Sequence, residues 1–95
     1  MTTKLCARLP VSLIDKLAKN ESTPNCQVGQ LIDTFYWNSL PYDSDLDLHG
    51  IETKQLTIRC SKTGLDALKK YASYHAKPMN VSIVQAFILL GQYRP

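Results

Sequence analysis

Two stretches decide how this chain folds: KLCARLP at residues 4–10 and QLTIRCS at residues 55–61. In both, apolar residues alternate with polar or charged ones, which is typical of a short strand that buries one face. Arg8 and Arg59 occupy matching places in the two stretches, 51 residues apart. Because a single strand of about six residues is not stable on its own, we expect the two strands to pair with each other.

Each strand is followed by two segments with the spacing of amphipathic helices. Pro10 and Ser61 suit the starts of the first helices, and Pro24 and Pro78 limit where those helices end. The apolar residues at helical spacing are Leu13, Ile14 and Leu17, then Val28, Leu31, Ile32 and Phe35 in the first copy, and Leu65, Leu68 and Ala72, then Val81, Ile83, Val84, Phe87, Ile88 and Leu90 in the second. The chain thus repeats a unit of one strand and two helices, which needs its twin to bury its apolar face.

The starts of the second helices are predicted at Asn25 and Asn80, because Asn is a good N-cap residue. The interval from Arg8 to Asn25 is four residues shorter than the interval from Arg59 to Asn80. Four residues is close to one helical turn. The first helix of the second copy is therefore predicted to be one turn longer than its counterpart.

The charges divide the chain into three parts. The first copy spans residues 1–41, an acidic linker spans 42–53 and the second copy spans 54–95, and we expect the two copies to share one core. The linker has four acidic residues and no Lys or Arg, whereas the rest has eleven basic and four acidic residues. This balance favours an anionic partner, although a solvated surface gives the same pattern. Leu46, Leu48 and Ile51 are expected to hold the linker against the surface.

Length and composition exclude several classes of protein. A chain of 95 residues is expected to form one domain, and no apolar run reaches the roughly 18–20 residues that cross a bilayer. The first residues lack the layout of a signal peptide, so we expect a cytoplasmic protein with no membrane partner. Cys6, Cys26 and Cys60 are far apart and form no CxxC motif, which argues against a disulfide framework or a metal site. No catalytic residue, cofactor or small-molecule substrate is expected, since no nucleophile–base pair or phosphate-binding glycine loop is present.

The order of short strand, Arg, apolar residue, Pro or Ser, helix, polar turn and second helix resembles the ribbon-helix-helix DNA-binding proteins, the group that includes the Arc and MetJ repressors. The resemblance covers nearly the whole chain apart from the linker. Most members are dimers of single copies, whereas this chain resembles the tandem form found among TraY-type accessory proteins of plasmid conjugation. The resemblance implies a mainly α fold with a short two-stranded antiparallel β-ribbon, in which two tandem units form an intramolecular pseudo-dimer of order β-α-α-linker-β-α-α.

The same resemblance implies which side chains contact bases. It pairs Lys4 with Arg59, Cys6 with Thr57 and Arg8 with Gln55, and turns the polar face of the ribbon to the major groove. The base-contacting set is then Lys4, Cys6, Arg8, Gln55, Thr57 and Arg59. Arg and Lys donate to guanine, Gln engages adenine and Thr meets thymine, so all but the cysteine suit base edges. The alternative is that these side chains are simply the exposed face of an edge ribbon.

Phosphate contacts are implied at the N-termini of the second helices, where free N–H groups and the helix dipole favour an anion. The matching residues are Asn25, Cys26 and Gln27 in the first copy and Asn80, Val81 and Ser82 in the second, with Lys54 and Lys77 as further candidates. Ordinary helix capping explains the same residues and is compatible with phosphate binding. The other lysines of the helices are expected on a solvated face.

The aromatic residues are not expected to stack on bases. Phe35 falls on the apolar stripe of its helix, whereas Tyr36 and Trp37 do not, and we expect those two to pack against the linker or another protomer. Tyr71, Tyr74 and Tyr93 are expected at the edge of the core.

The sequence therefore predicts a sequence-specific protein that binds double-stranded DNA and acts as a transcriptional repressor or a relaxosome accessory factor encoded by a plasmid or phage. Because the two outward triplets differ, one molecule is predicted to bind an asymmetric site. A different class stays open, in which the fold binds and inhibits a protein, as an antitoxin or a phage decoy would. The chain's end at Pro95 counts against the antitoxin form, which usually adds a disordered tail. Further self-association on DNA is a third possibility.

Overall fold

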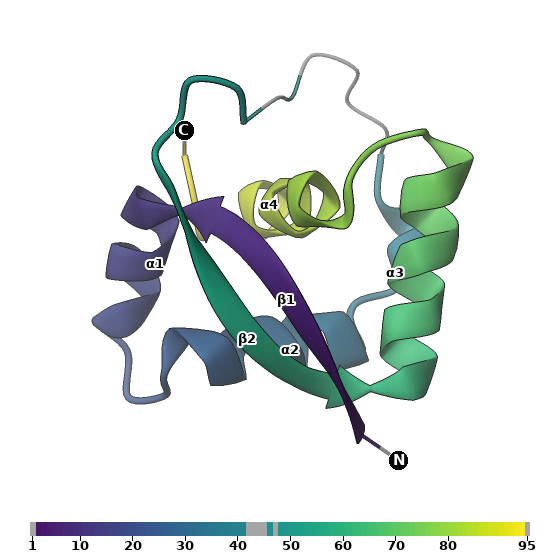
Figure 1. The fold of residues 1–95 in the computed structure, drawn as a ribbon, viewed down its shortest axis with the longest axis horizontal. Coiled ribbons are helices and arrows are strands. Elements are labelled where there is room, and N and C mark those ends of the chain that lie inside the picture. The colour runs from purple at the N-terminus through teal and green to yellow at the C-terminus, as the bar shows by residue number, and fades with distance from the viewer. Residues whose placement is uncertain (1, 42–45, 47, 95) are drawn as a thin grey trace.

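The structure is a computed structural model that describes residues 2–41, 46 and 48–94. Along the chain the elements are β1 (Thr2–Pro10), α1 (Val11–Ala18), α2 (Pro24–Thr34), the 3₁₀ helix η1 (Trp37–Ser39), β2 (Thr53–Ser61), α3 (Lys62–Tyr74) and α4 (Met79–Leu89). The fold is mainly α with one two-stranded sheet, as predicted (Figure 1). Strand β2 begins at Thr53, the last residue of the expected linker.

The two strands form an antiparallel ribbon in the predicted register. Lys4 lies opposite Arg59, Cys6 opposite Thr57 and Arg8 opposite Gln55, so the pairing that the resemblance implied is confirmed. The alternate residues point to the helices and are buried: Leu5, Ala7, Leu9, Leu56, Ile58 and Cys60. Period-two alternation therefore produces a ribbon with an apolar underside and a polar outer face.

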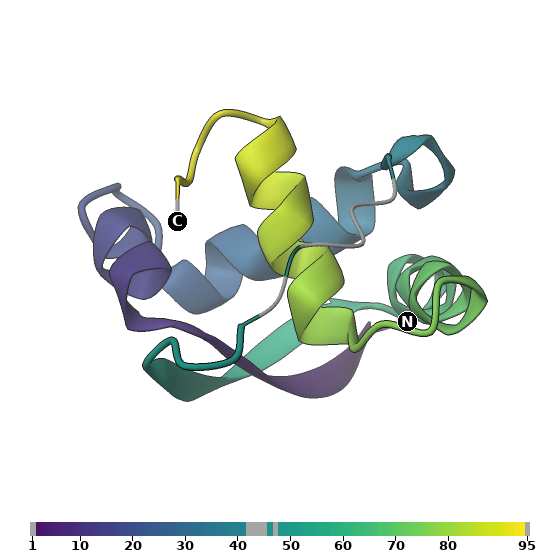
Figure 2. The same cartoon turned by 90° about the horizontal axis from the view of Figure 1, so that it is seen from above.

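The four helices lie on one side of the ribbon, and the ribbon forms the opposite face (Figure 2). Helix α4 rises from the ribbon through the middle of the molecule, and its residues Val81–Val84, Ala86 and Phe87 are buried. A helix that is apolar on nearly all sides belongs inside a core. Helix α2 crosses behind the ribbon and contributes Val28, Leu31 and Ile32 to the same core. The two copies thus share a single core.

Several helix boundaries follow the predictions. Ser61 caps α3, since its hydroxyl accepts a hydrogen bond from the N–H of Gly64 at 3.0 Å. Helix α3 has 13 residues and α1 has 8, which confirms that the second copy has the longer first helix. The extra length is about one turn.

The predicted caps of the second helices are wrong. Thr23 caps α2 through its hydroxyl, and Pro78 precedes α4. Asn25 and Asn80 are instead the second residues of their helices. Proline favours the first helical turn because its missing N–H is not needed there, so Pro24 begins α2 before Asn25. Both asparagine side chains are left to bond elsewhere, as described below.

Three apolar or aromatic side chains lie elsewhere than expected. Trp37 is only 2% exposed and belongs to the core, where its indole N–H donates to the carbonyl oxygen of Ile32 at 3.3 Å. Tyr74 is 85% exposed, and Leu90, just beyond the end of α4, is 48% exposed. Helical periodicity misplaced Leu90 because α4 ends at Leu89. Trp37, expected off the apolar stripe, lies in η1 and reaches the core from there.

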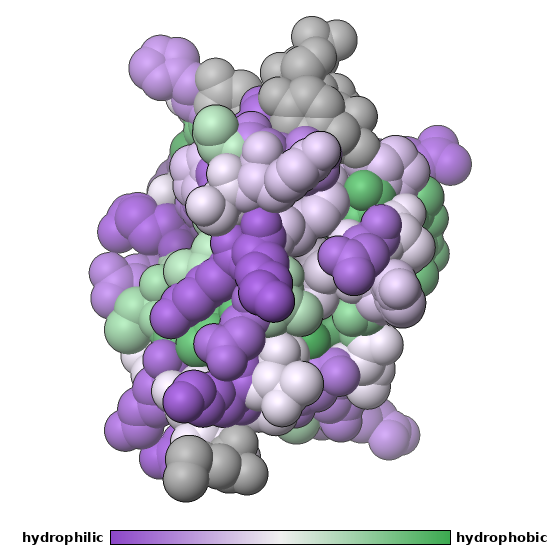
Figure 3. Space-filling model, turned by 90° about the vertical axis from the view of Figure 1, so that its right-hand side faces the viewer, coloured by the Kyte–Doolittle hydropathy of each residue, from purple (hydrophilic) through white to green (hydrophobic). Residues whose placement is uncertain are grey.

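The described part of the linker contacts the rest of the molecule. Leu46, Leu48 and Ile51 are half-buried, as expected, and the carbonyl of Glu52 accepts a hydrogen bond from the N–H of Val11 at 3.0 Å. Asp43, Asp45 and Asp47 lie outside the described residues. The surface on the α3 side is largely hydrophilic with smaller apolar patches (Figure 3), and the exposed lysines Lys62, Lys69 and Lys70 belong to α3. Within the described residues, no helix has the length and apolar character needed to span a membrane.

Candidate nucleic-acid interface

The outer face of the ribbon brings together all six residues predicted to contact bases. Each of these side chains is exposed, and the register sets them in two rows of three: Lys4, Cys6 and Arg8 on β1, and Gln55, Thr57 and Arg59 on β2. We call this set the reading face. Its centre is the pair Cys6 and Thr57, whose sulfur and hydroxyl oxygen lie 3.8 Å apart.

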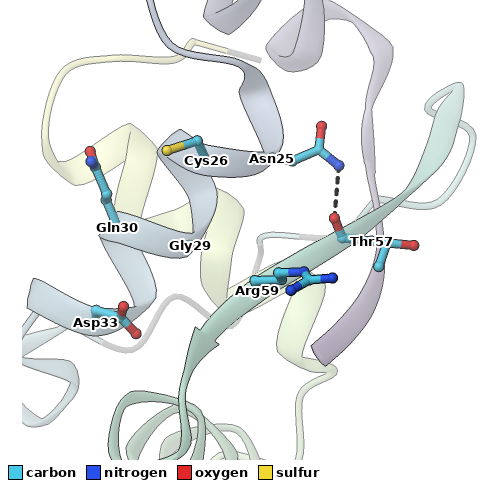
Figure 4. A pocket seen from close by; sticks show the side chains of 7 residues that line it. All are labelled: Asn25, Cys26, Gly29, Gln30, Asp33, Thr57 and Arg59. Atoms are coloured by element: carbon cyan, nitrogen blue, oxygen red, sulfur yellow. Dashed lines mark hydrogen bonds between the residues drawn. The ribbon is translucent and has the colours of Figure 1, made fainter. Parts of the chain in front are cut away.

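The two arginines of the reading face have different surroundings. Arg8 donates from Nε to the hydroxyl of Thr53 and from a terminal nitrogen to the carbonyl of Thr53, each at 3.1 Å. These bonds hold its guanidinium toward the end of the ribbon. Arg59 makes no such bonds with the described residues and lies beside a pocket between β2 and α2 (Figure 4). The two arginines thus occupy matching positions in the sequence, but only the Arg8 guanidinium is held by hydrogen bonds within the described residues.

Both edges of the ribbon are bonded to the second helices. The side-chain amide of Asn25 donates to the carbonyl oxygen of Thr57 at 2.7 Å (Figure 4), and that of Asn80 donates to the carbonyl oxygen of Arg8 at 3.0 Å. Each helix therefore attaches to the strand of the other copy. These amides satisfy carbonyl groups on ribbon edges that would otherwise be open.

Two of the three N–H groups expected to bind phosphate on α2, those of Cys26 and Gln27, already have acceptors. The N–H of Cys26 donates to the Thr23 hydroxyl at 3.3 Å, and the N–H of Gln27 donates to the Thr23 carbonyl. The Gln27 side chain also donates to the carbonyls of Leu17 and Ser22. Gln27 thus joins the end of α1 to the start of α2, and a phosphate here would share or displace these acceptors.

On α4 the N–H groups of Val81 and Ser82 are engaged in the same way. The N–H of Val81 donates to the side-chain oxygen of Asn80 at 3.0 Å, and the N–H of Ser82 donates to the carbonyl of Pro78 at 3.3 Å. Val81 and Ser82 are also buried. Any phosphate contact at these two residues is therefore limited to their backbone.

The two candidate lysines differ in their availability. Lys54 is exposed on β2 next to Gln55, near one end of the ribbon. The ammonium of Lys77 donates to the carbonyl oxygen of Leu46 at 2.9 Å and is partly buried. Lys54 extends the positive charge of the ribbon, whereas Lys77 attaches the linker.

Sequence reasoning missed three residues that shape this surface. Thr53 holds Arg8 but was assigned to the linker. Asp33 accepts a hydrogen bond from the N–H of Ser61 at 2.6 Å. Gly29 allows α2 to approach β2, because a Cβ there would lie 2.3 Å from the carbonyl oxygen of Arg59. The signal for Gly29 was present in the sequence, since a lone glycine inside a helix often marks close packing.

Among the residues that the structure describes, no group of three or more His, Cys, Asp or Glu side chains is placed to hold a metal ion. Comparison with protein-family models, with curated proteins and with solved structures found no match to this chain. The geometry of the ribbon and its flanking helices therefore carries the functional argument.

Proposed function

We propose that this protein is a sequence-specific, double-stranded DNA-binding protein of the tandem ribbon-helix-helix kind, which inserts its β-ribbon into the major groove. The observation that supports the proposal most strongly is the reading face itself. Six exposed side chains stand in two registered rows over a buried apolar underside. A two-stranded ribbon is narrow enough to enter the major groove.

The chemistry of the reading face suits base edges. Arg59 and Lys4 can donate to guanine O6 and N7, and Gln55 can form two hydrogen bonds with adenine. Three of the six side chains are cationic and none is acidic, which favours a polyanion over an acidic or neutral protein surface. The positive charge of Lys54 at one end adds to this preference.

The two rows differ in sequence, so the proposed target is an asymmetric site read by one molecule. A symmetric dimer would instead require a palindrome. Repression of transcription and assembly of a relaxosome at a transfer origin both need this same ribbon. The structure is compatible with either role.

Selection of preferred duplexes from a random pool, at a stated salt concentration, tests the proposal. We expect an enriched, non-palindromic motif. Arg59→Ala should weaken binding to that motif by about 1–3 kcal/mol and relax the preference at one base pair. Lys69→Ala, an exposed change on α3 away from the ribbon, is the matched control and should bind normally.

Two outcomes would contradict the proposal. If the pool yields no enriched motif, the fold serves another partner, and protein inhibition becomes the better hypothesis. If a motif is enriched but Arg59→Ala binds it as the unaltered protein does, the ribbon is not the surface that reads DNA.

A further inference from the structure

The two sides of the ribbon are not equivalent, although the sequence repeats. The ribbon has a pseudo-twofold axis at the pair Cys6 and Thr57, which relates β1 to β2. The same axis relates α2 to α4, so that Asn25 corresponds to Asn80, and Gly29 to Val84. We call the side where α2 lies along β2 the α2 flank, and the side where α4 lies along β1 the α4 flank.

A close approach of helix to strand is found on the α2 flank. A Cβ at Gly29 would lie 2.3 Å from the carbonyl oxygen of Arg59, a distance that any other residue would have to relieve by moving the helix. The corresponding residue on the α4 flank is Val84, whose side chain is fully buried. Consistent with this difference, α2 packs more closely against β2 than α4 does against β1.

The asparagine contacts show how far the two flanks differ. Asn25 donates to the carbonyl of Thr57, in the central pair of the ribbon. A symmetric arrangement would place Asn80 at the carbonyl of Cys6, but Asn80 donates to the carbonyl of Arg8, two residues further along. Two residues of strand correspond to roughly 7 Å. Helix α4 therefore begins further from the ribbon centre than α2.

A pocket of about 410 Å³ accompanies the close α2 flank. Asn25, Cys26 and Gly29 line it from α2, and Thr57 and Arg59 line it from β2 (Figure 4). The pocket opens beside the start of α2, next to the guanidinium of Arg59. On the other side of the ribbon, the arginine in the matching position is held by Thr53.

From these differences we infer that the two flanks favour one orientation of the protein on its DNA site. This preference is independent of the six side chains of the reading face. The α2 flank contacts the DNA backbone nearer the centre of the site than the α4 flank does. This inference rests on the proposed DNA binding and deepens it, because it assigns part of the specificity to Gly29 and Asn25, which read no bases.

Exchanging the two rows of the reading face tests this inference. The starting protein carries Cys6→Ser, and the exchanged protein carries K4Q, C6T, Q55K and T57S, so that each row takes the residues of the other. All four positions are exposed, and thermal melting checks that both proteins fold alike. On a symmetric scaffold the exchanged protein would bind the same duplex with equal affinity, turned end for end. We expect it to bind about tenfold or more weakly, because the backbone contacts no longer match the bases.

A cleavage reagent on Cys26 shows the orientation directly. In both proteins Cys26 is the one exposed cysteine within the described residues, since Cys60 is buried. With the starting protein, we expect cleavage at one end of the site only. Equal affinity of the two proteins, with cleavage moved to the other end, would overturn the inference. Loss of specific binding by the starting protein itself would instead count against the proposed function.

Discussion

The carboxylate of Asp33 accepts a hydrogen bond from the backbone N–H of Ser61 at 2.6 Å, which joins the end of α2 to the point where β2 passes into α3. The hydroxyl of Ser61 in turn caps α3 through the N–H of Gly64. Gly64 also packs tightly, since a Cβ there would lie 2.7 Å from the carbonyl oxygen of Ile32. One short segment thus positions three elements around the Arg59 end of the ribbon.

Removal of this carboxylate should destabilise the fold. Asp33→Ala leaves the N–H of Ser61 without its charged acceptor, and we expect a loss of about 1–2 kcal/mol in the free energy of unfolding, measured by urea denaturation. Asp33→Asn keeps a neutral acceptor and should lose less. Asp66→Ala, at an exposed position of α3, is the control and should change stability by under about 0.5 kcal/mol. Equal effects of Asp33→Ala and Asp66→Ala would contradict the role given to Asp33.

Stability should fall at alkaline pH because of Cys60. Burial, and secondarily the nearby charge of Asp33, raises the pKa of the Cys60 thiol above its ordinary value of 9.0. The unfolded chain therefore releases this proton at a lower pH than the folded chain does, so stability is lost as pH rises from about 9 through the folded pKa. Urea denaturation across this range, in reducing buffer, measures the slope.

The matched variants for this pH dependence are Cys60→Ala and Cys6→Ala. Cys60→Ala should be less stable at neutral pH, because it leaves a small cavity, but it should show a shallower decline above about pH 9. Cys6→Ala, at an exposed position, should keep the decline of the unaltered protein. An unchanged slope in Cys60→Ala would mean that other groups cause the alkaline loss.

Gly29→Ala should destabilise the protein although alanine is the better helix former. The added Cβ would overlap the backbone carbonyl of Arg59, and this group cannot move without disturbing the ribbon. We expect a net loss of about 1–2 kcal/mol, since overpacking usually costs more than the helix propensity gained. Gln30→Ala, an exposed change in the next residue, is the control. A stabilised Gly29→Ala variant would show that α2 can move away freely.

The sequence was sufficient to predict the ribbon, because two independent regularities agree there. The alternation in residues 4–9 and 55–60 has period two, and the repeat places those stretches in matching positions. The antiparallel sense and the register were implied by the family resemblance, and the observed pairs Cys6–Thr57 and Arg8–Gln55 agree with them. The alternation supports this register, since a shift of one strand by one residue would turn its apolar side chains outward.

The contacts between the helices and the ribbon edges could not be predicted in this way. Asn25 has the chemistry of an N-cap. Whether its side chain caps α2 or donates to a carbonyl of β2 depends on where β2 lies in space. The close approach at Gly29 depends on the same tertiary position. The local sequence pattern therefore predicted the helices and strands. Tertiary packing determined the hydrogen-bond partners of their polar side chains.

The core position of Trp37 could not be predicted from local pattern either, and removal of its side chain should reduce the free energy of unfolding strongly. It lies in the short 3₁₀ helix η1 outside any α-helical stripe, yet it packs 4.9 Å from Phe35 and 6.4 Å from Tyr71 between ring centroids. We expect Trp37→Ala to lose about 3–5 kcal/mol of unfolding free energy. Tyr36→Ala, next to it but 67% exposed, should lose far less. Comparable losses in the two variants would place Trp37 outside the core in solution.

The salt dependence of DNA binding should separate Lys54 from Lys77. Each phosphate contact by a cation contributes about 0.9 to the slope of log affinity against log salt. Lys54 is exposed at the end of the ribbon, so Lys54→Ala should reduce that slope by about 1 and weaken all duplexes alike. The ammonium of Lys77 bonds the carbonyl of Leu46, and for this reason Lys77→Ala should leave the slope unchanged while reducing stability. Titration of each variant at several salt concentrations measures both slopes. A reduced slope for Lys77→Ala would mean that its ammonium leaves Leu46 for a phosphate when DNA binds, as the sequence alone suggested.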